Sequence, residues 1–198
     1  MSSLYIQTWQ DCYQGGNISD KKATIDKPIA VLGGGPSLPL DLAILYDTFR
    51  DNIVYMAINH HAQRIIPVDF MAFLDKPEYI KDFETKLGFV DAIGDESTIN
   101  ITTHVDKANV YIDIPYWDDV ESTSLAAIWA ACWMGTKAVY LCGMNLFMTR
   151  PAYFYKWEGG YFPGQLEYKR SIYRKAFDTC EDPGRIRAIS GPLTAVFR

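Results

Sequence analysis

The chain has 198 residues, of which 48% are hydrophobic and 22% are charged. This composition is typical of a folded globular protein and excludes a disordered one, and the length suffices for one domain with a real core. The net charge is −5, and lysines and arginines do not cluster along the sequence. Nucleic acid is therefore not an expected partner.

The sequence also argues against a membrane protein and a disulfide-bonded one. The longest apolar stretch, residues 125–147, is broken by Gly135, Thr136 and Lys137, and residues 1–14 lack the pattern of a signal peptide. We therefore expect a cytoplasmic protein without a membrane span. The cysteines lie far apart, without the spacing of metal ligands, and are expected to be reduced thiols: Cys12, Cys132, Cys142 and Cys180.

Along the chain, residues 1–28 predict an N-terminal arm and residues 29–198 a single domain in which short apolar runs alternate with segments of helical periodicity. Strands that alternate with helices imply right-handed crossovers. The sequence thus predicts an α/β fold: a Rossmann-like single domain with a mainly parallel central sheet and helices on both faces. The predicted strands are 29–32, 53–58, 70–74, 100–103, 110–112, 137–141 and 186–189, and the predicted helices are 38–49, 59–65, 77–87, a helix that starts at 122–124 and stops at Gly135, and 165–177.

A glycine loop, Gly33-Gly34-Gly35, connects the first predicted strand to a helix that follows Ser37. Such a loop brings bare backbone N–H groups and the positive end of a helix dipole to one point, which suits a phosphate. Glycine permits both close approach of a phosphate and the positive φ angles of a tight turn. The loop lacks the lysine of a P-loop and the third glycine of the dinucleotide fingerprint. The alternative is a packing turn with a Ser37 cap and Pro39 in the first helical turn.

Polar residues follow the predicted strands, where ligands of open parallel sheets bind. Asn59 is a candidate for base, ribose or phosphate contacts, or else caps the next short helix. His60 or His61 is a candidate general base or phosphate ligand, with only one of them expected to point into the site, or else is solvated or capping. Asp75 is a candidate for a ribose hydroxyl or a divalent ion, or a helix cap.

Two later segments add candidates. Thr123 and Ser124 bring hydroxyl and N–H groups to a second helix N-terminus, which suits a second anion site or only a cap. Residues 151–164 combine glycines with aromatic rings, including Tyr153, Tyr155 and Tyr161, as an active-site lid would, although an oligomer interface or a packed surface loop has the same composition.

The order and spacing of six motifs resemble a known group of proteins, over roughly residues 29–147. The motifs are Val31–Leu38, Ala57–Ala62, Pro67–Phe70, Phe73–Asp75, Thr123–Ala127 and Val139–Asn145. They resemble bacterial sialyltransferases that use CMP-sialic acid, together with motility accessory factors and the archaeal hydroxymethyldihydropterin pyrophosphokinases. Short proteins of phage genomes are similar too.

The resemblance implies roles for individual residues. It implies phosphate contacts from Gly34, Gly35 and Ser37, sugar or base contacts from Asn59, and a donor site lined by Thr123 and Ser124. Asn145 follows the last central strand of that pattern. In the sialyltransferases a histidine in the C-terminal third acts as base and tyrosines assist the leaving phosphate. This chain has no histidine after His104, so His60 or His61 is the candidate base, with Tyr153, Tyr155 or Tyr161 beside the phosphate.

We therefore expect a nucleotide-binding or nucleotide-sugar-binding, glycosyltransferase-like enzyme with a CMP-type donor. One alternative is a Mg²⁺-dependent pyrophosphokinase-like transferase that uses ATP and Asp75. Another is a nucleotide-binding protein without catalysis. The expected partner is a small nucleotide, and the chain is a candidate homo-oligomer.

Overall fold

The computed structural model describes residues 25–74, 98–102, 110–111, 122–146, 148–149, 151, 153–154, 163–177 and 183–197. Several predicted features lie outside these residues: most of the arm at 1–28, the helix at 77–87, Asp75, Tyr155 and Tyr161, and Cys12 and Cys180.

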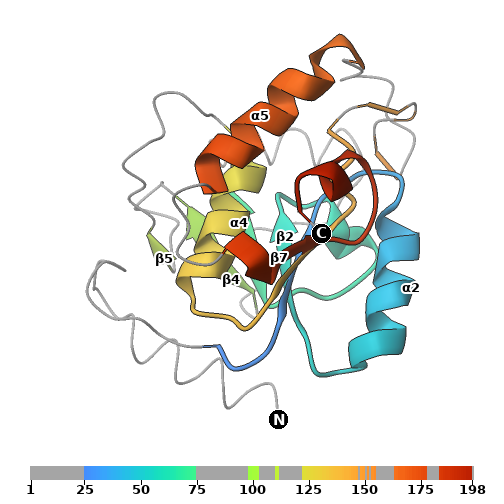
Figure 1. The fold of residues 1–198 in the computed structure, drawn as a ribbon. Coiled ribbons are helices and arrows are strands. Elements are labelled where there is room, and N and C mark those ends of the chain that lie inside the picture. The colour runs from blue at the N-terminus through green and yellow to red at the C-terminus, as the bar shows by residue number, and fades with distance from the viewer. Residues whose placement is uncertain are drawn as a thin grey trace.

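The centre of the molecule is a parallel sheet of seven strands in the order β5-β4-β3-β2-β1-β6-β7 (Figure 1). Every pair of neighbouring strands is parallel, which confirms the predicted fold class. The strands are β1 Ile29–Leu32, β2 Val54–Ile58, β3 Phe70–Phe73, β4 Ile99–Thr102, β5 Val110–Tyr111, β6 Val139–Cys142 and β7 Ile186–Ala188. The predicted strand positions were therefore right to within one or two residues.

Helices cover both faces of this sheet. The side chains of β1 alternate between two hydrophobic cores, with Ile29 and Val31 in one and Ala30 and Leu32 in the other. Helix α2 (Leu38–Phe49) packs into the core of Ala30, whereas α4 (Thr123–Trp133) and α5 (Leu166–Phe177) pack into the core of Ile29. Figure 1 shows α2 apart from α4 and α5 accordingly.

The predicted helix limits agree closely with the structure, with one correction. Helix α2 has the predicted bounds, and Gly135 ends α4 with a φ of 70°, as expected. The helical segment expected at 59–65 is only a 3-10 turn, η2 (Ala62–Arg64), because Asn59 has a φ of 53°. The apolar side chains of α2 that recur at helical spacing include Tyr46, which is nevertheless 52% exposed, with the Arg50 guanidinium over its ring.

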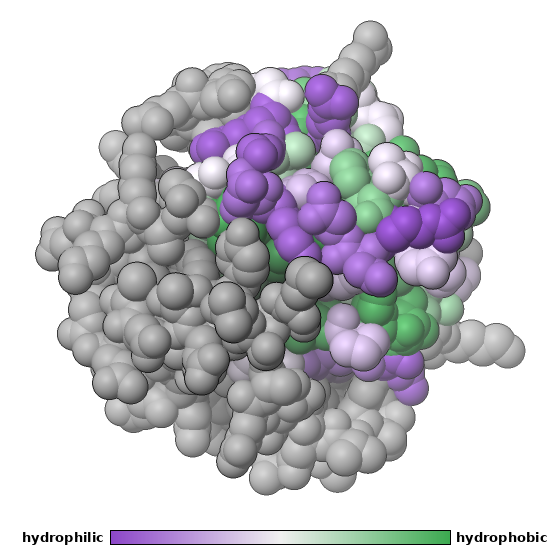
Figure 2. Space-filling model, turned by 90° about the horizontal axis from the view of Figure 1, so that it is seen from below, coloured by the Kyte–Doolittle hydropathy of each residue, from purple (hydrophilic) through white to green (hydrophobic). Residues whose placement is uncertain are grey.

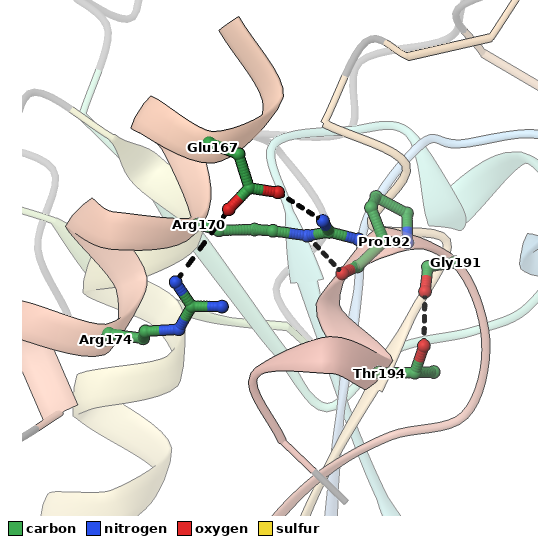
Figure 3. Close-up of polar contacts among 6 residues, drawn as sticks. All are labelled: Glu167, Arg170, Arg174, Gly191, Pro192 and Thr194. Carbon is green, nitrogen blue, oxygen red and sulfur yellow. Dashed lines mark hydrogen bonds and ion pairs between the residues drawn. The ribbon is translucent and has the colours of Figure 1, made fainter.

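The C-terminal segment holds α5 in place through polar contacts (Figure 3). Arg170 of α5 donates from Nε to the carbonyl oxygen of Pro192 at 3.0 Å and pairs with Glu167 at 2.6 Å. Pro192 begins the 3-10 helix η8 (Pro192–Ala195), whose Thr194 hydroxyl donates to the Gly191 carbonyl. Of these contacts, the Arg170 bond connects α5 to the segment after β7 and so helps to fix the orientation of α5.

The surface below the sheet is mixed in character. Figure 2 views the molecule from below, and the described residues there present hydrophilic side chains interspersed with hydrophobic ones. Within the described residues, no helix has the length and apolar content needed to cross a membrane.

Candidate functional site

A cavity of about 250 Å³ opens at the carboxyl edge of the sheet, beside the ends of β1 and β6. The chain proceeds from β1 through β2 to β5 on one side and then returns to β6 on the other, so β1 and β6 flank a topological switch point. Open parallel sheets bind ligands at such points. The lining residues are Gly33, Gly34, Gly35, Ile58, Asn59, His61, Ser122, Thr123, Ser124, Gly143, Met144, Asn145, Leu146, Tyr153 and Tyr173.

The three positions of the loop need glycine because neighbouring atoms pack closely against them, and not because their φ angles are positive. None of the three glycines has the positive φ that was expected of a tight turn. A β-carbon on Gly33 would lie 2.6 Å from the Gly143 carbonyl oxygen, and one on Gly34 would lie 2.6 Å from the Tyr153 ring. A β-carbon on Gly35 would collide with the Asn145 side chain. A larger residue at any of the three positions would push apart the walls of the cavity.

The expectation of bare N–H groups is wrong for two of the three glycines. Gly33 donates to the Cys142 carbonyl at 2.8 Å and Gly35 to the Gly143 carbonyl at 2.7 Å. These bonds extend the pairing of β1 with β6 beyond the ends of the strands. Gly34 is different: its carbonyl accepts from the Phe154 N–H at 2.8 Å, and its own N–H has no partner among the described residues.

Asp41, which the sequence analysis missed, belongs to the first turn of α2 and is buried in the protein interior. Its side chain is fully buried, and Oδ2 accepts from the Gly143 N–H at 2.8 Å and from the Ser37 hydroxyl at 3.0 Å. A carboxylate in the first helical turn offsets the positive end of the helix dipole. The N-terminus of α2 therefore already has an anionic partner.

Ser37 and Asn145 meet at the same place. The Ser37 hydroxyl also lies 3.1 Å from Asn145 Oδ1, although these residues are 108 positions apart. Ser37 is the N-cap residue of α2 but makes no side-chain cap bond, so the packing-turn alternative is wrong about a capping side chain there. Asn145 lines the cavity as predicted, and its carbonyl accepts from the Met148 N–H at 2.9 Å.

The N-terminus of α4 has the opposite arrangement. Its first turn contains no acidic residue, and Ser122, Thr123 and Ser124 all line the cavity. Ser122 makes no side-chain cap bond. At the other end, Arg185 donates from Nη2 to the Cys132 carbonyl at 2.8 Å and so satisfies the negative end of α4. The positive end of α4 thus faces the cavity uncompensated by any carboxylate in its own first turn.

Three hydroxyl groups form a chain at this helix end. Ser122 Oγ lies 2.6 Å from Ser124 Oγ, which lies 2.5 Å from Tyr173 Oη. Tyr173 belongs to α5 and is 5% exposed, and burial raises the pKa of its phenol while the two serine hydroxyls oppose that rise. The sequence analysis missed Tyr173 because it falls on the apolar side of α5 with Phe177, where an aromatic residue reads as core.

A lysine of α5 lies beside the same wall. Lys169, one helical turn before Tyr173, donates from Nζ to the carbonyl of Leu146, a lining residue, at 3.1 Å. Partial burial lowers the pKa of this amine. The sequence offered no signal for Lys169, because α5 contributes to the site only through tertiary packing.

Asn59 lines the same cavity as the hydroxyl chain. It does not cap η2, which begins at Ala62, so the capping alternative is wrong. Its backbone N–H donates to the Ala72 carbonyl at 2.9 Å, while its Oδ1 is buried and has no partner among the described residues. A buried amide oxygen without a partner is costly, so this atom suits a hydrogen-bond donor of a ligand.

Both histidines are buried, which overturns the alternative that they are solvated. His60 is 3% exposed and His61 is 6% exposed, and only His61 lines the cavity. The His61 ring stacks on Tyr153 with centroids 4.5 Å apart. Burial, followed by the nearby His60 and Arg64, lowers the pKa of His61 to about 3. Burial and then Arg64 lower the pKa of His60 to about 4, so both rings are neutral and weakly basic near pH 7.

Tyr153 and Phe154 belong to the segment predicted as a lid, and they lie against the glycine loop. Tyr153 lines the cavity, and the Phe154 N–H bond to Gly34 anchors its neighbour. The missing side chain of Gly34 is what lets the Tyr153 and His61 rings approach the loop.

The cavity thus gathers most of the predicted site residues. Lining it are Gly33, Gly34, Gly35, Asn59, His61, Thr123, Ser124, Asn145 and Tyr153, with Ser37 bonded directly behind Asn145. His60 lies behind His61, and Asp75, Tyr155 and Tyr161 lie outside the described residues. In the part of the chain that is described, no group of three His, Cys, Asp or Glu side chains could hold a metal ion.

No family model and no curated protein matches the chain in sequence. Solved structures do resemble it. An α-2,3-sialyltransferase from Campylobacter jejuni, in apo form, superposes with a TM-score of 0.51 at 12% identity, over 90% of this chain and 82% of that chain. At this identity the likeness concerns the fold alone. The chain therefore has an α/β fold similar to that of a sialyltransferase.

A second solved structure, the MAf glycosyltransferase from Magnetospirillum magneticum AMB-1, matches with a TM-score of 0.47 and 18% identity. The match covers 64% of this chain but only 24% of that chain. The chain thus spans about a quarter of the length of that protein.

Proposed function

We propose that the chain is a glycosyltransferase-like enzyme whose cavity binds a nucleotide or nucleotide sugar of CMP type. The observation that carries the proposal is the pairing of opposite polarities within one cavity. Donors gather at the N-terminus of α4, and Asn59, whose buried side-chain oxygen has no partner among the described residues, lines the same cavity. A nucleotide offers the complementary set, with phosphate oxygens as acceptors and base or ribose groups as donors.

The position of the phosphate follows from the charges at the two helix ends. The end of α2 is filled by Asp41, so we assign the phosphate to the end of α4. Gly34 lines the same cavity, and the Lys169 amine is bonded to the carbonyl of the lining residue Leu146. Base and ribose then extend toward Asn59, whose side-chain oxygen has no partner among the described residues.

The assignment of the chemical groups is part of the proposal. Of the three tyrosines that the sequence suggested for the leaving phosphate, Tyr153 is the one among the described residues, and it lines the cavity. His61 is the candidate histidine that lines the cavity, but its low pKa makes it a poor proton acceptor near pH 7. An acceptor hydroxyl activated by the departing phosphate itself would not need a protein base.

A thermal-shift panel tests the proposal. CMP, other nucleoside phosphates and CMP-sugars are added with and without EDTA, and a ligand at one hundred times its Kd stabilises the fold by about 2.7 kcal/mol. A shift with CMP or a CMP-sugar that survives EDTA supports the proposal. A shift seen only with ATP and Mg²⁺ would favour the pyrophosphokinase-like alternative, and no shift with any nucleotide would overturn both.

A second measurement distinguishes an enzyme from a protein that binds the nucleotide without turnover. Release of CMP from CMP-sialic acid is followed for the wild-type chain and for Asn59→Ala. If the wild-type chain releases CMP and Asn59→Ala does not, the protein is an enzyme. If the wild-type chain binds CMP-sialic acid without releasing CMP, it is a nucleotide-binding protein without catalysis.

A further inference from the structure

The chain of hydroxyls at the N-terminus of α4 has a direction that can be deduced by counting protons. Three hydroxyls carry three protons, and the two contacts Ser122–Ser124 and Ser124–Tyr173 use two of them. One proton is left over at one end of the chain. The end of the hydroxyl chain that carries this spare proton decides what the three hydroxyls can bind.

The buried end of the chain cannot keep the spare proton without cost. Tyr173 Oη makes its short contact with Ser124, while the Ser122 hydroxyl also lowers its pKa, and the side chain is 5% exposed. If Ser124 donated to Tyr173, the buried phenol proton would have no acceptor at as short a distance, which is the unfavourable case for a polar group. Tyr173 therefore donates to Ser124, and Ser124 donates to Ser122.

The spare proton then belongs to Ser122, at the cavity. Ser122 is the N-cap of α4, yet its hydroxyl makes no cap bond, and its short contact is with Ser124. Hydrogen bonds in such a chain polarise one another, so each donation strengthens the next. The Ser122 hydroxyl is thereby presented as a donor, next to the N–H groups of the first turn of α4.

We infer that Tyr173 is a positioning residue for the anionic part of the ligand, which acts through Ser124 to aim the Ser122 hydroxyl at a phosphate oxygen. The inference rests on the proposed nucleotide site and names which end of the ligand this wall recognises. It also explains why the orientation of α5 matters to a site built mainly from residues after β1 and β6. The Arg170 bond to Pro192, one turn before Tyr173 on the same helix, helps to fix that orientation (Figure 3).

Tyr173→Phe tests the inference, because it keeps the ring in the core and removes only the hydroxyl. Isothermal titration compares wild type and variant with three probes: CMP, cytidine and inorganic pyrophosphate. We expect CMP and pyrophosphate to bind on the order of tenfold more weakly to the variant, with cytidine unchanged. Loss of the core contact alone would weaken cytidine and CMP equally.

Two further variants control the measurement. Tyr168→Phe makes the same chemical change on the same helix at a side chain that is 65% exposed, and we expect wild-type affinities. Ser124→Ala breaks the chain at its middle, so the double variant with Tyr173→Phe should bind CMP no more weakly than Ser124→Ala alone.

The outcomes separate this inference from the proposed function. If wild type binds pyrophosphate but not CMP, the nucleotide proposal fails, and the inference stands provided that Tyr173→Phe weakens pyrophosphate binding. If wild type binds CMP and Tyr173→Phe leaves the ratio of CMP to cytidine affinity unchanged, the inference is overturned while the nucleotide site stands. If no probe binds wild type, both are overturned.

Discussion

Two helices present their N-termini at the same edge of the sheet, and the protein treats them in opposite ways. Helix α2, after the glycine loop, has a fully buried carboxylate in its first turn, bonded to the Gly143 N–H. Helix α4 has no acidic residue in its first turn and opens into the cavity with three hydroxyl residues. The same dipole thus helps to hold the fold together at α2, whereas at α4 it meets no carboxylate in the first turn and is the end that we propose for the phosphate.

The difference shows that a glycine loop before a helix is not sufficient evidence of a phosphate site. The bonds from Gly33 and Gly35 to the carbonyls of Cys142 and Gly143 serve the junction of β1 with β6. The loop still shapes the cavity, since it makes room for Tyr153 and Asn145. Its described role is to bring the walls together, and for this reason we assign the proposed phosphate to α4.

The largest expected effect follows from removing the carboxylate at α2. Asp41→Ala leaves the buried Gly143 N–H without its acceptor and removes one of the two acceptors of the Ser37 hydroxyl, and we expect the free energy of unfolding to fall by about 3 kcal/mol. Urea denaturation measures the change. Asp41→Asn retains an acceptor oxygen and should lose less, and Asp47→Asn, on the exposed side of α2, should be nearly neutral. An Asp41→Ala variant as stable as wild type would show that this contact does not hold the junction.

A smaller effect on stability is expected when the pH is lowered. It arises from His61, which lines the cavity beside the glycine loop. Because burial lowers the pKa of His61 to about 3, the unfolded chain takes up a proton near pH 6.5 and the folded chain does not. Stability is therefore complete above about pH 6.5 and falls as the pH is lowered, by about 2 kcal/mol from this histidine between pH 7 and pH 5. Urea denaturation at both pH values should give a smaller difference for His61→Gln. An equal difference in both proteins would mean that His61 is protonated in the folded state.

The variant with the smallest expected effect on stability is also the most direct test of the comparison between the N-termini of α2 and α4. Thr123→Asp gives α4 the acidic first turn that α2 already has, which should raise helix stability by up to about 1 kcal/mol and weaken CMP binding at least about tenfold. Leu40→Asp adds the same charge to the first turn of α2, at a side chain that is 65% exposed, and should leave the Kd within about threefold. Titration calorimetry measures both. If Leu40→Asp proves the more harmful, the phosphate lies at α2 and the comparison is reversed.

The sequence by itself determined the elements and their order. The apolar runs of β1 and β6 and the periodicity of α2 and α4 depend on neighbouring residues, so local pattern predicted them within one or two positions. The parallel arrangement followed from the alternation of strands with helices. The sequence also placed several lining residues at strand ends and helix starts, where the cavity is found: the three glycines, Asn59, Thr123, Ser124 and Asn145.

Only the tertiary structure decided how these residues are used. The bond from Gly143 to Asp41 joins residues 102 positions apart, and the bond between Ser124 and Tyr173 joins residues 49 apart. Such contacts depend on which strands are neighbours and on how α5 packs, and neither is encoded in a local pattern. For the same reason the sequence could identify His61 but could not say that burial would remove its basicity at neutral pH.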